Sequence, residues 1–260
     1  GGSLLRARPA HVAKIKIPLP PLSEQKRIAE ILDRAEALRA KRRAALALLD
    51  ELTQSIFLDM FGDPVSNPMG WESVAFESQI QSVRYGTGSP PDYVEEGIPF
   101  IRATNIKRGT VLPKDLKRIS QVDADRISKC KVWAGDMIVV RSGVNTGDAA
   151  VISDELDGAC AAFDLIVELN PNSAVFYNFL INSPHGKRML SPLTRRAAQP
   201  HLNADQLRTL VLIAPPMELR EEFVARVKAV NKLRKLHADS QVELDQLFAS
   251  LQHRAFRGEL

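Results

Sequence analysis

Residue types that could support catalysis occur in the sequence, but their spacing matches none of the common catalytic motifs. Gly86-Thr87-Gly88 is the nearest approach to a cofactor-binding glycine loop, yet no convincing apolar strand precedes it. Pro90-Pro91 lacks the polar and aromatic neighbours that flank such a pair in adenine methyltransferases. Asp92 has no Glu-x-Lys downstream, as a nuclease would need, because the only such triplet is Glu24-Gln25-Lys26.

Histidine and cysteine residues are not spaced as metal ligands. The histidines are scattered at His11, His185, His201, His237 and His253. A lone histidine is far more often structural or solvated than a ligand. Cys130 and Cys160 form no Cys-x-x-Cys pair, which favours reduced, buried thiols. The sequence therefore predicts a chain that is not an enzyme and that holds no cofactor and no metal.

Composition and charge place the chain among soluble proteins. Its 260 residues are 45% hydrophobic and 25% charged, close to the average for globular proteins. No apolar run reaches the roughly 18 residues of a membrane span, and Gly1-Gly2-Ser3 begins no signal peptide, so we expect a cytoplasmic protein with no membrane partner. The net charge is +4, yet residues 62–213 carry 16 basic and 17 acidic groups. Basicity alone is therefore weak evidence for nucleic-acid binding.

An internal repeat organises the chain. Pro20-Pro21-Leu22 recurs as Pro215-Pro216-Met217, and the same offset of 195 aligns Leu49-Asp50 with Leu244-Asp245. One gap-free offset over about 40 residues favours duplication of a rigid helical element, because loops tolerate insertions. Each copy predicts a long helix that is opened by proline in its first turn and is about 60 Å long at 1.5 Å per residue.

Seven-residue spacing of apolar residues predicts that the two helices pair as an antiparallel coiled coil. In the first copy we expect one seam series at Ile28, Ala35, Arg42, Leu49 and Ile56 and a second at Ile31, Leu38, Ala45, Leu52 and Asp59. In the second copy the series are Phe223, Val230, His237, Leu244 and Leu251, and Arg226, Leu233, Ser240, Leu247 and Arg254. Arg42 and His237 are equivalent and would meet at mid-seam, either as a polar layer that fixes register or as side chains that reach solvent past the seam.

The segment between the helices predicts a mixed α/β domain. Short strand-like runs occur at 98–101, 137–141, 149–152 and 165–169, a helix broken near Pro184 is expected over 174–189, and Asn203-x-x-Gln206 is typical of a capping box. The fold class is therefore α+β, with this domain inserted between the two helices. The expected divisions are 1–17, 18–61 (first long helix), 62–213 (inserted domain) and 214–260 (second long helix).

Several motifs together resemble a known family. They are Ile17-Pro18-Leu19-Pro20-Pro21-Leu22-Ser23-Glu24-Gln25-Lys26-Arg27-Ile28-Ala29, Gly97-Ile98-Pro99-Phe100-Ile101-Arg102, Gly135-Asp136-Met137-Ile138-Val139-Val140-Arg141-Ser142-Gly143, and Gln199-Pro200-His201-Leu202-Asn203. With both helices, they resemble the DNA-specificity subunit of type I restriction-modification systems. The resemblance implies a target-recognition domain that reads one half of a bipartite site on double-stranded DNA. It also implies that modification (methyltransferase) subunits dock on the helices, and restriction subunits through them.

The chain departs from that family by having one complete recognition domain. Residues 1–17 would be the tail of an upstream, truncated recognition domain or a leader left by cloning. A half-length subunit would instead restore two recognition domains by forming a homodimer. The alternative to DNA recognition is a coiled-coil assembly scaffold without direct base readout, which the net charge of the inserted domain also fits.

Candidate DNA contacts lie on loops that carry side chains able to reach bases or phosphates. The set is Tyr85, Thr87, Ser89, Lys107, Arg108, Arg141, Ser142, Asn145, Thr146, Arg195, Arg196, Gln199 and His201. Arg102 and Asn105 lie in a family-like run, yet could simply hold the domain together.

Overall fold

The chain forms two compact units in the computed structural model, which describes residues 9–14, 19–107, 109–194 and 201–260. One unit comprises residues 1–54 and 228–260, and the other comprises residues 55–227. Within these described residues, none of the helices combines the length and the apolar character needed to cross a bilayer.

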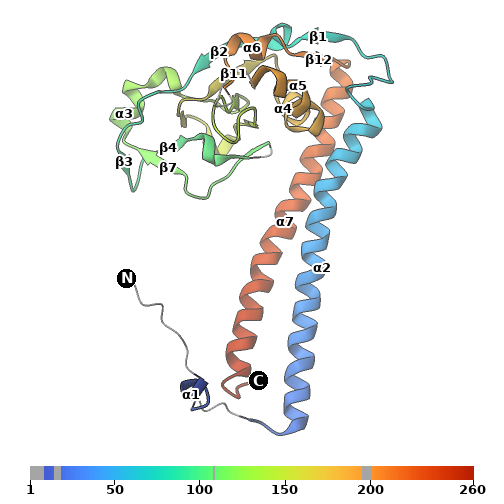
Figure 1. Ribbon diagram of the computed structural model, residues 1–260, viewed down its shortest axis with the longest axis vertical. Helices are drawn as coiled ribbons and strands as arrows, with labels where there is room; N and C mark the ends of the chain where they lie inside the picture. Colours follow the sequence, from blue (N-terminus) through green and yellow to red (C-terminus); the bar gives the residue numbers. More distant parts are fainter. Residues whose placement is uncertain (1–8, 15–18, 108, 195–200) are drawn as a thin grey trace. The chain divides into compact units, whose positions relative to one another are not determined.

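The first unit is built on most of two long helices, α2 (Leu22–Phe61) and α7 (Met217–Ala255), preceded by the short α1 (Pro9–Val12). Residues 55–61 of α2 and 217–227 of α7 belong to the second unit. The expected proline pairs stand just before each long helix, and the carbonyls of Pro21 and Pro216 accept its first backbone hydrogen bonds. The helices lie side by side and run in opposite directions (Figure 1). The contacts fix this direction, because Arg39 pairs with Asp245 while Asp50, further along α2, pairs with Arg234, earlier on α7.

The polar contacts of the helix pair follow the internal repeat. Arg39 Nε donates to Asp245 at 2.6 Å, and Arg234 Nη2 lies 2.7 Å from Asp50. The offset of 195 turns either ion pair into the other. Arg42 and His237 are equivalent under this offset, and Arg42 Nη1 donates to His237 Nδ1. The predicted contact at the centre of the helix pair is therefore confirmed. The helix pair therefore has a local two-fold axis that passes through the Arg42–His237 contact.

The structure confirms the first predicted seam series and corrects the second. None of the ten residues at the first-series positions is exposed. In the second series Leu38, Leu52, Leu233 and Leu247 are exposed by between 42% and 54%. The positions one residue later, which include Arg39 and Thr53 on α2 and Arg234 and Phe248 on α7, are buried or half-buried.

The physical reason for this correction is the pitch of the helix. A residue three positions after a seam residue points about 60° to one side, and a residue four positions after it points about 40° to the other. Either side can carry the seam, so hydrophobicity along one helix does not choose between them. Here Arg39 lies in the seam because its guanidinium stacks 4.4 Å from the centroid of the Phe248 ring and pairs with Asp245.

This choice of seam leaves apolar side chains uncovered on one face of the helix pair. We call this the leucine face: Leu38, Leu48 and Leu52 of α2 with Leu233, Leu236 and Leu247 of α7, all exposed. At 100° per residue, each points between about 40° and 120° to the same side of Arg42 or His237. A two-fold axis perpendicular to the plane of two antiparallel helices keeps each face on its own side. All six side chains therefore share one face.

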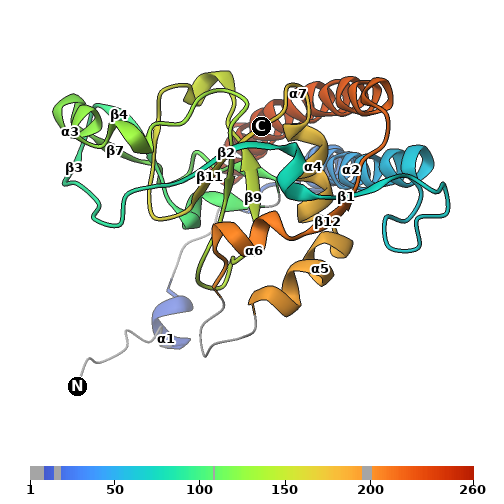
Figure 2. The ribbon, with the colours of Figure 1, turned by 90° about the horizontal axis from the view of Figure 1, so that it is seen from above.

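The second unit contains two four-stranded sheets and two short strand pairs (Figure 2). The first sheet has the order β2-β11-β8-β9, from Ile80–Tyr85, Leu165–Leu169, Met137–Val139 and Ala149–Val151. The second has the order β10-β4-β7-β3, from Cys160–Ala161, Ile98–Ile101, Lys117–Ile119 and Tyr93–Val94. The pairs are β1 (Ser73–Ala75) with β12 (Val211–Ile213), and β5 (Ile106–Lys107) with β6 (Thr110–Val111).

Helices complete the second unit on two sides of the first sheet. They are α3 (Gln121–Arg126), α4 (Ala174–Asn182), α5 (Pro184–Thr194) and α6 (Ala204–Arg208). Figures 1 and 2 both show α3 with the β4-β7-β3 strands on one side and α4 with α5 on the other. The predicted break at Pro184 and the Asn203–Gln206 capping box are both confirmed.

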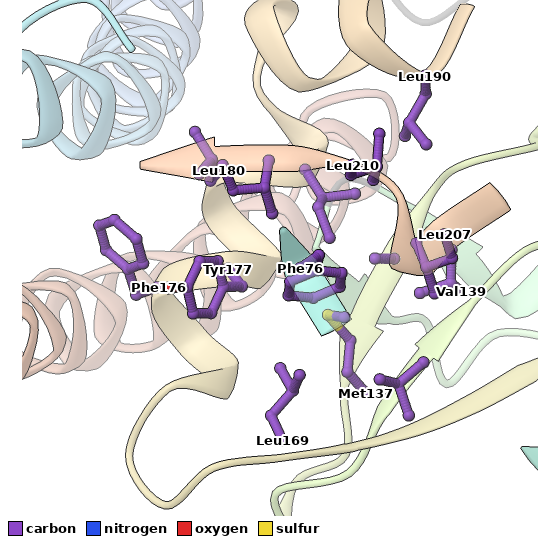
Figure 3. Packing of buried hydrophobic residues seen from close by; sticks show 14 of the residues in the cluster. Phe76, Met137, Val139, Leu169, Phe176, Tyr177, Leu180, Leu190, Leu207 and Leu210 are labelled. Carbon is purple, nitrogen blue, oxygen red and sulfur yellow. The ribbon is translucent and has the colours of Figure 1, made fainter. Parts of the chain in front are cut away.

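The first sheet is buried on both faces, which explains its continuous apolar runs. Successive side chains of a strand point to opposite faces. Met137 and Val139 therefore join the core beside Tyr177 of α4 (Figure 3), whereas Ile138 joins a separate core on the other face. The expected strands at 98–101, 137–141, 149–152 and 165–169 are all present, with shorter bounds in two cases. The chain is α+β, as predicted.

Candidate nucleic-acid interface

Three strand ends of the first sheet meet at one edge. Strands β2 and β8 both run antiparallel to β11, so their last residues lie beside its first. Leu165 at the start of β11 pairs with Tyr85 of β2 on one side and Val139 of β8 on the other. This topology brings Tyr85, Arg141 and the pair Phe163-Asp164 together, although they are far apart in sequence.

Arg141 lies between two aromatic rings at this edge. Its guanidinium carbon is 4.8 Å from the centroid of the Tyr85 ring and 4.2 Å from that of Phe163. Tyr85 and Phe163 are both exposed, so the rings face solvent while holding the cation. A guanidinium over an aromatic face is attracted by the ring quadrupole, and this attraction is stronger where water is excluded. We call Arg141, Tyr85, Phe163 and His201 the arginine clasp.

His201 and the backbone around it hold the arginine clasp in addition to the two aromatic rings. Arg141 Nη2 and His201 Nε2 are 2.7 Å apart. The chain from His201 runs beside Ser142 as a β-bridge, and the Leu202 N–H donates to the Arg141 carbonyl at 2.7 Å. The Tyr85 hydroxyl accepts the Ala204 N–H at 3.2 Å, which ties that ring to the start of α6. Side-chain and backbone contacts thus tie Arg141 and Tyr85 to the segment that begins at His201.

Asp164 lies beneath the clasp and links two of the strand ends. It is 3% exposed, its carboxylate Oδ1 accepts the Arg141 backbone N–H at 3.1 Å, and its carbonyl accepts the Gly86 N–H at 2.9 Å. Burial raises the pKa of this carboxyl to about 6, while the hydrogen bond from the Arg141 backbone and the Arg141 charge act in the opposite direction. The carboxylate therefore offsets part of the positive charge of the clasp at neutral pH.

Gly86 is required because two segments of the chain approach each other closely at this position. A Cβ at this position would lie 1.9 Å from the Ala162 carbonyl oxygen. The close crossing of these two segments therefore depends on the missing side chain at Gly86. The neighbouring Thr87 pairs with Ala162 as a bridge, and its hydroxyl donates to the Ser89 carbonyl and accepts the Ser89 N–H, so both residues hold their own turn.

The turn after β8 places more polar residues next to the clasp. It runs from Arg141 to Asp148 and is closed by hydrogen bonds between Val140 and both Gly147 and Asp148. Ser142, Asn145 and Thr146 lie on this turn and are half-buried. Val144 at its tip is fully exposed. An uncovered apolar side chain beside polar ones is a combination that contacts to base edges use.

The remaining predicted contacts fall elsewhere or outside the described residues. Lys107 is exposed on β5, and no described contact joins it to the arginine clasp. Arg108, Arg195, Arg196 and Gln199 lie outside the described residues. Thus Tyr85, Arg141, Ser142 and His201 come together, and Thr87, Ser89, Asn145 and Thr146 lie on the two adjoining turns.

Phe163, Asp164 and Val144 belong to this site but were missed in the sequence. Phe163 and Asp164 immediately precede the apolar run 165–169. The sequence signal was therefore their position just before the first residue of a buried strand. Val144 follows Gly143 at the tip of a turn, where an apolar residue has no structural use. Each signal depends on knowing which strands are neighbours.

Arg102 and Asn105 hold a second turn together, in line with the structural alternative. Asn105 is 1% exposed, accepts the Arg102 backbone N–H and donates to the Lys114 carbonyl. Arg102 Nη2 donates to the Asp115 carbonyl at 2.7 Å, and its guanidinium lies 5.9 Å from the exposed Tyr93 ring. Among the described residues, no group of three or more His, Cys, Asp or Glu side chains could hold a metal ion.

Comparisons with known proteins agree on one family. Residues 1–47 match the family model of the type I restriction modification DNA specificity domain. The chain is 26% identical over 280 residues to the specificity subunit of the type I restriction enzyme EcoBI of Escherichia coli, covering 94% of this chain and 58% of that protein. The chain is similar to the type I specificity subunits.

Solved structures of that family share the fold. The type I restriction-modification S subunit from M. genitalium has a TM-score of 0.60 at 12% identity, with 96% of this chain and 65% of that one covered. A chain from a structure of complex assembly and conformational transition of the type I R-M system has a TM-score of 0.57 at 22% identity, with 94% and 62% covered. The present chain thus spans about three fifths of the length of these type I specificity subunits.

Proposed function

We propose that the chain is the non-catalytic, sequence-recognition subunit of a type I restriction-modification complex. The observation that carries this proposal is the arginine clasp: an arginine held between two exposed aromatic rings, beside a turn of polar side chains. Arginine and small polar side chains are the groups that read base edges in the major groove. The proposed DNA contacts are Tyr85, Arg141, Ser142, Asn145, Thr146 and His201, with Phe163 and Val144 added.

The local symmetry of the helix pair supports a bipartite target. Two equivalent helices related by a two-fold axis provide equivalent attachment points at their opposite ends. A rod of about 60 Å would hold two base-reading modules at a fixed separation, as half-site spacing mirrors protein symmetry in dimeric DNA-binding proteins. The inserted domain of this chain would read one half of the site. The second module would come from another recognition domain or from a second copy of this chain.

The leucine face is the proposed docking surface for the modification subunits. Soluble proteins rarely leave a contiguous set of large apolar side chains uncovered without a partner. Leu38 with Leu233 and Leu52 with Leu247 are equivalent under the offset of 195, so these four side chains offer similar contacts to two copies of one partner. The structural relative with a TM-score of 0.57 comes from a structure of complex assembly of the type I R-M system. Restriction subunits would join through the modification subunits.

The test of DNA recognition is an electrophoretic shift with random duplexes, with and without a modification subunit. We expect enrichment of one sequence pattern and a steep fall of affinity as salt rises, because phosphate contacts release counterions. No sequence preference in either case would contradict the proposal and favour an assembly scaffold without base readout.

The docking proposal is tested by polar substitutions on the leucine face. The double variant Leu38→Ser/Leu233→Ser should weaken binding of the modification subunit and leave the melting temperature nearly unchanged, because both side chains are already exposed. Val242→Ser is the matched control, since Val242 is equally exposed but points away from that face. Equal effects of the two variants in a pull-down or in calorimetry would rule out the leucine face as the docking surface.

A further inference from the structure

We propose that Arg141 reads a guanine through the O6 and N7 acceptors of its major-groove edge. This inference rests on the proposed DNA recognition and names the base that the site selects. It makes Tyr85, Phe163 and His201 positioning residues that act through Arg141. Phe163 has no polar group and would not be expected to read a base itself.

Two rings restrict the guanidinium. Their centroids lie 4.8 and 4.2 Å from its central carbon, which limits the directions from which a ligand can approach, and its N–H groups point outward in its own plane. His201 Nε2 lies 2.7 Å from Nη2 and restrains rotation within that plane. An arginine fixed in this way has lost most of its freedom before a ligand arrives, which favours a geometrically demanding contact.

Donors of Arg141 remain available. A guanidinium carries five N–H groups, and the described residues provide one side-chain partner, His201. Arg141 Nε is buried and lacks a hydrogen-bond partner among the described residues. Because Nε is closed to solvent, a base would be met by the terminal Nη groups, of whose N–H donors the described residues use only the one directed at His201.

A base edge suits the surroundings better than a phosphate does. Asp164, 3% exposed, lies directly behind Arg141 and offsets its charge, which weakens attraction to a phosphate. The adjoining turn presents Ser142, the fully exposed Val144, and Asn145 rather than further cations. A valine at the tip gains nothing from a phosphate, whereas apolar side chains contact thymine methyl groups in the major groove.

Guanine is the base that matches two adjacent donors. Its N7 and O6 are neighbouring acceptors, and bidentate arginine to this pair is the commonest specific contact in the major groove. Adenine places an amino donor beside N7, so one donor of the guanidinium would face another donor. Cytosine presents a donor and thymine a single acceptor with a methyl group. The clasp therefore discriminates for guanine at one position.

The experiment is selection of bound duplexes from a random pool by the full chain with its modification subunit. The wild type should give at least one G·C position, and Arg141→Lys should reduce discrimination there by about 5- to 150-fold, the range expected for one bidentate pair. Lysine keeps the charge but loses the planar pair of donors. Phe163→Leu should reduce discrimination at the same position, by a smaller factor.

A change on the DNA side avoids any effect on folding. Replacing that guanine by 7-deazaguanine removes the N7 acceptor, and this should weaken binding of the wild type while leaving binding of Arg141→Lys nearly unchanged. A loss of affinity in Arg141→Lys that is the same for all sequences would show that Arg141 contacts DNA without selecting a base, and it would overturn the inference. A sequence preference that is unaltered in Arg141→Lys would also overturn it but leave the proposed function standing. No preference in the wild type would overturn both.

Discussion

Replacement of Asp164 by asparagine should remove a pH-dependent destabilisation of the inserted unit. The pKa of this carboxyl is raised from 3.8 to about 6, chiefly by burial. Because the folded pKa lies above the unfolded one, the folded state favours the protonated form. The contribution of Asp164 to the free energy of unfolding is therefore most favourable below about pH 4 and falls as the pH rises through about 6. Asparagine retains the Oδ1 that accepts the Arg141 N–H and carries no charge.

The magnitude follows from the shift. A difference of about 2.2 between the two pKa values corresponds to about 3 kcal/mol between low and neutral pH. About 2 kcal/mol of this falls between about pH 4.5 and pH 7, which is an accessible range. Asp164→Asn should thus gain stability relative to the wild type across this interval, with the difference levelling off above about pH 7.

Urea unfolding of both proteins at several pH values is the assay. The difference in unfolding free energy between the two isolates Asp164, because other titrating groups contribute equally to both. A difference that stays constant with pH would refute the inference that burial controls this carboxyl. A difference that favours the wild type increasingly as pH rises would show that the Arg141 charge and the Arg141 backbone hydrogen bond outweigh burial.

Two matched pairs of variants test the core and the chain crossing. Phe61→Ala should cost about 3–5 kcal/mol of stability, because Phe61 is 0% exposed. Its repeat equivalent Phe256→Ala should cost under about 0.5 kcal/mol, because Phe256 is 70% exposed. Chemical unfolding measures both costs, and equal costs would contradict the packing described. Gly86→Ala should distort the ends of β2 and β10 and abolish sequence preference. Gly88→Ala should be tolerated, because its added Cβ would make an ordinary 3.6 Å contact with Phe163. Melting curves and duplex selection measure both effects, and a harmless Gly86→Ala would disprove the close approach of Gly86 to the Ala162 carbonyl.

The helical part of the fold could be predicted because its signals are local. Seven-residue spacing and the offset of 195 identified both long helices, their direction and the meeting of Arg42 with His237. The second seam series was wrong because the side of a helix that faces its partner is a property of the pair. Leu38 is the more apolar residue, but Arg39 stacks on Phe248 and pairs with Asp245, contacts that only the partner helix reveals.

The candidate site was predictable in residue type but not in assembly. Tyr85, Arg141 and His201 were identified as side chains on loops that could reach bases or phosphates. Their convergence depends on β11 lying between β2 and β8, a pairing that joins residues about 80 positions apart. β2 itself, with the sequence Ile-Gln-Ser-Val-Arg-Tyr, was missed because it mixes polar and apolar residues. Phe163 could not be assigned without that neighbour relation.

The central claim is that this chain confers sequence preference on the complex. The most direct measurement is competition between a selected duplex and a scrambled duplex of equal composition, for the modification subunit alone and for its complex with this chain. The account predicts no preference for the modification subunit alone and more than about tenfold preference once the chain is present. A preference that the modification subunit shows by itself, or none in the complex, would contradict it.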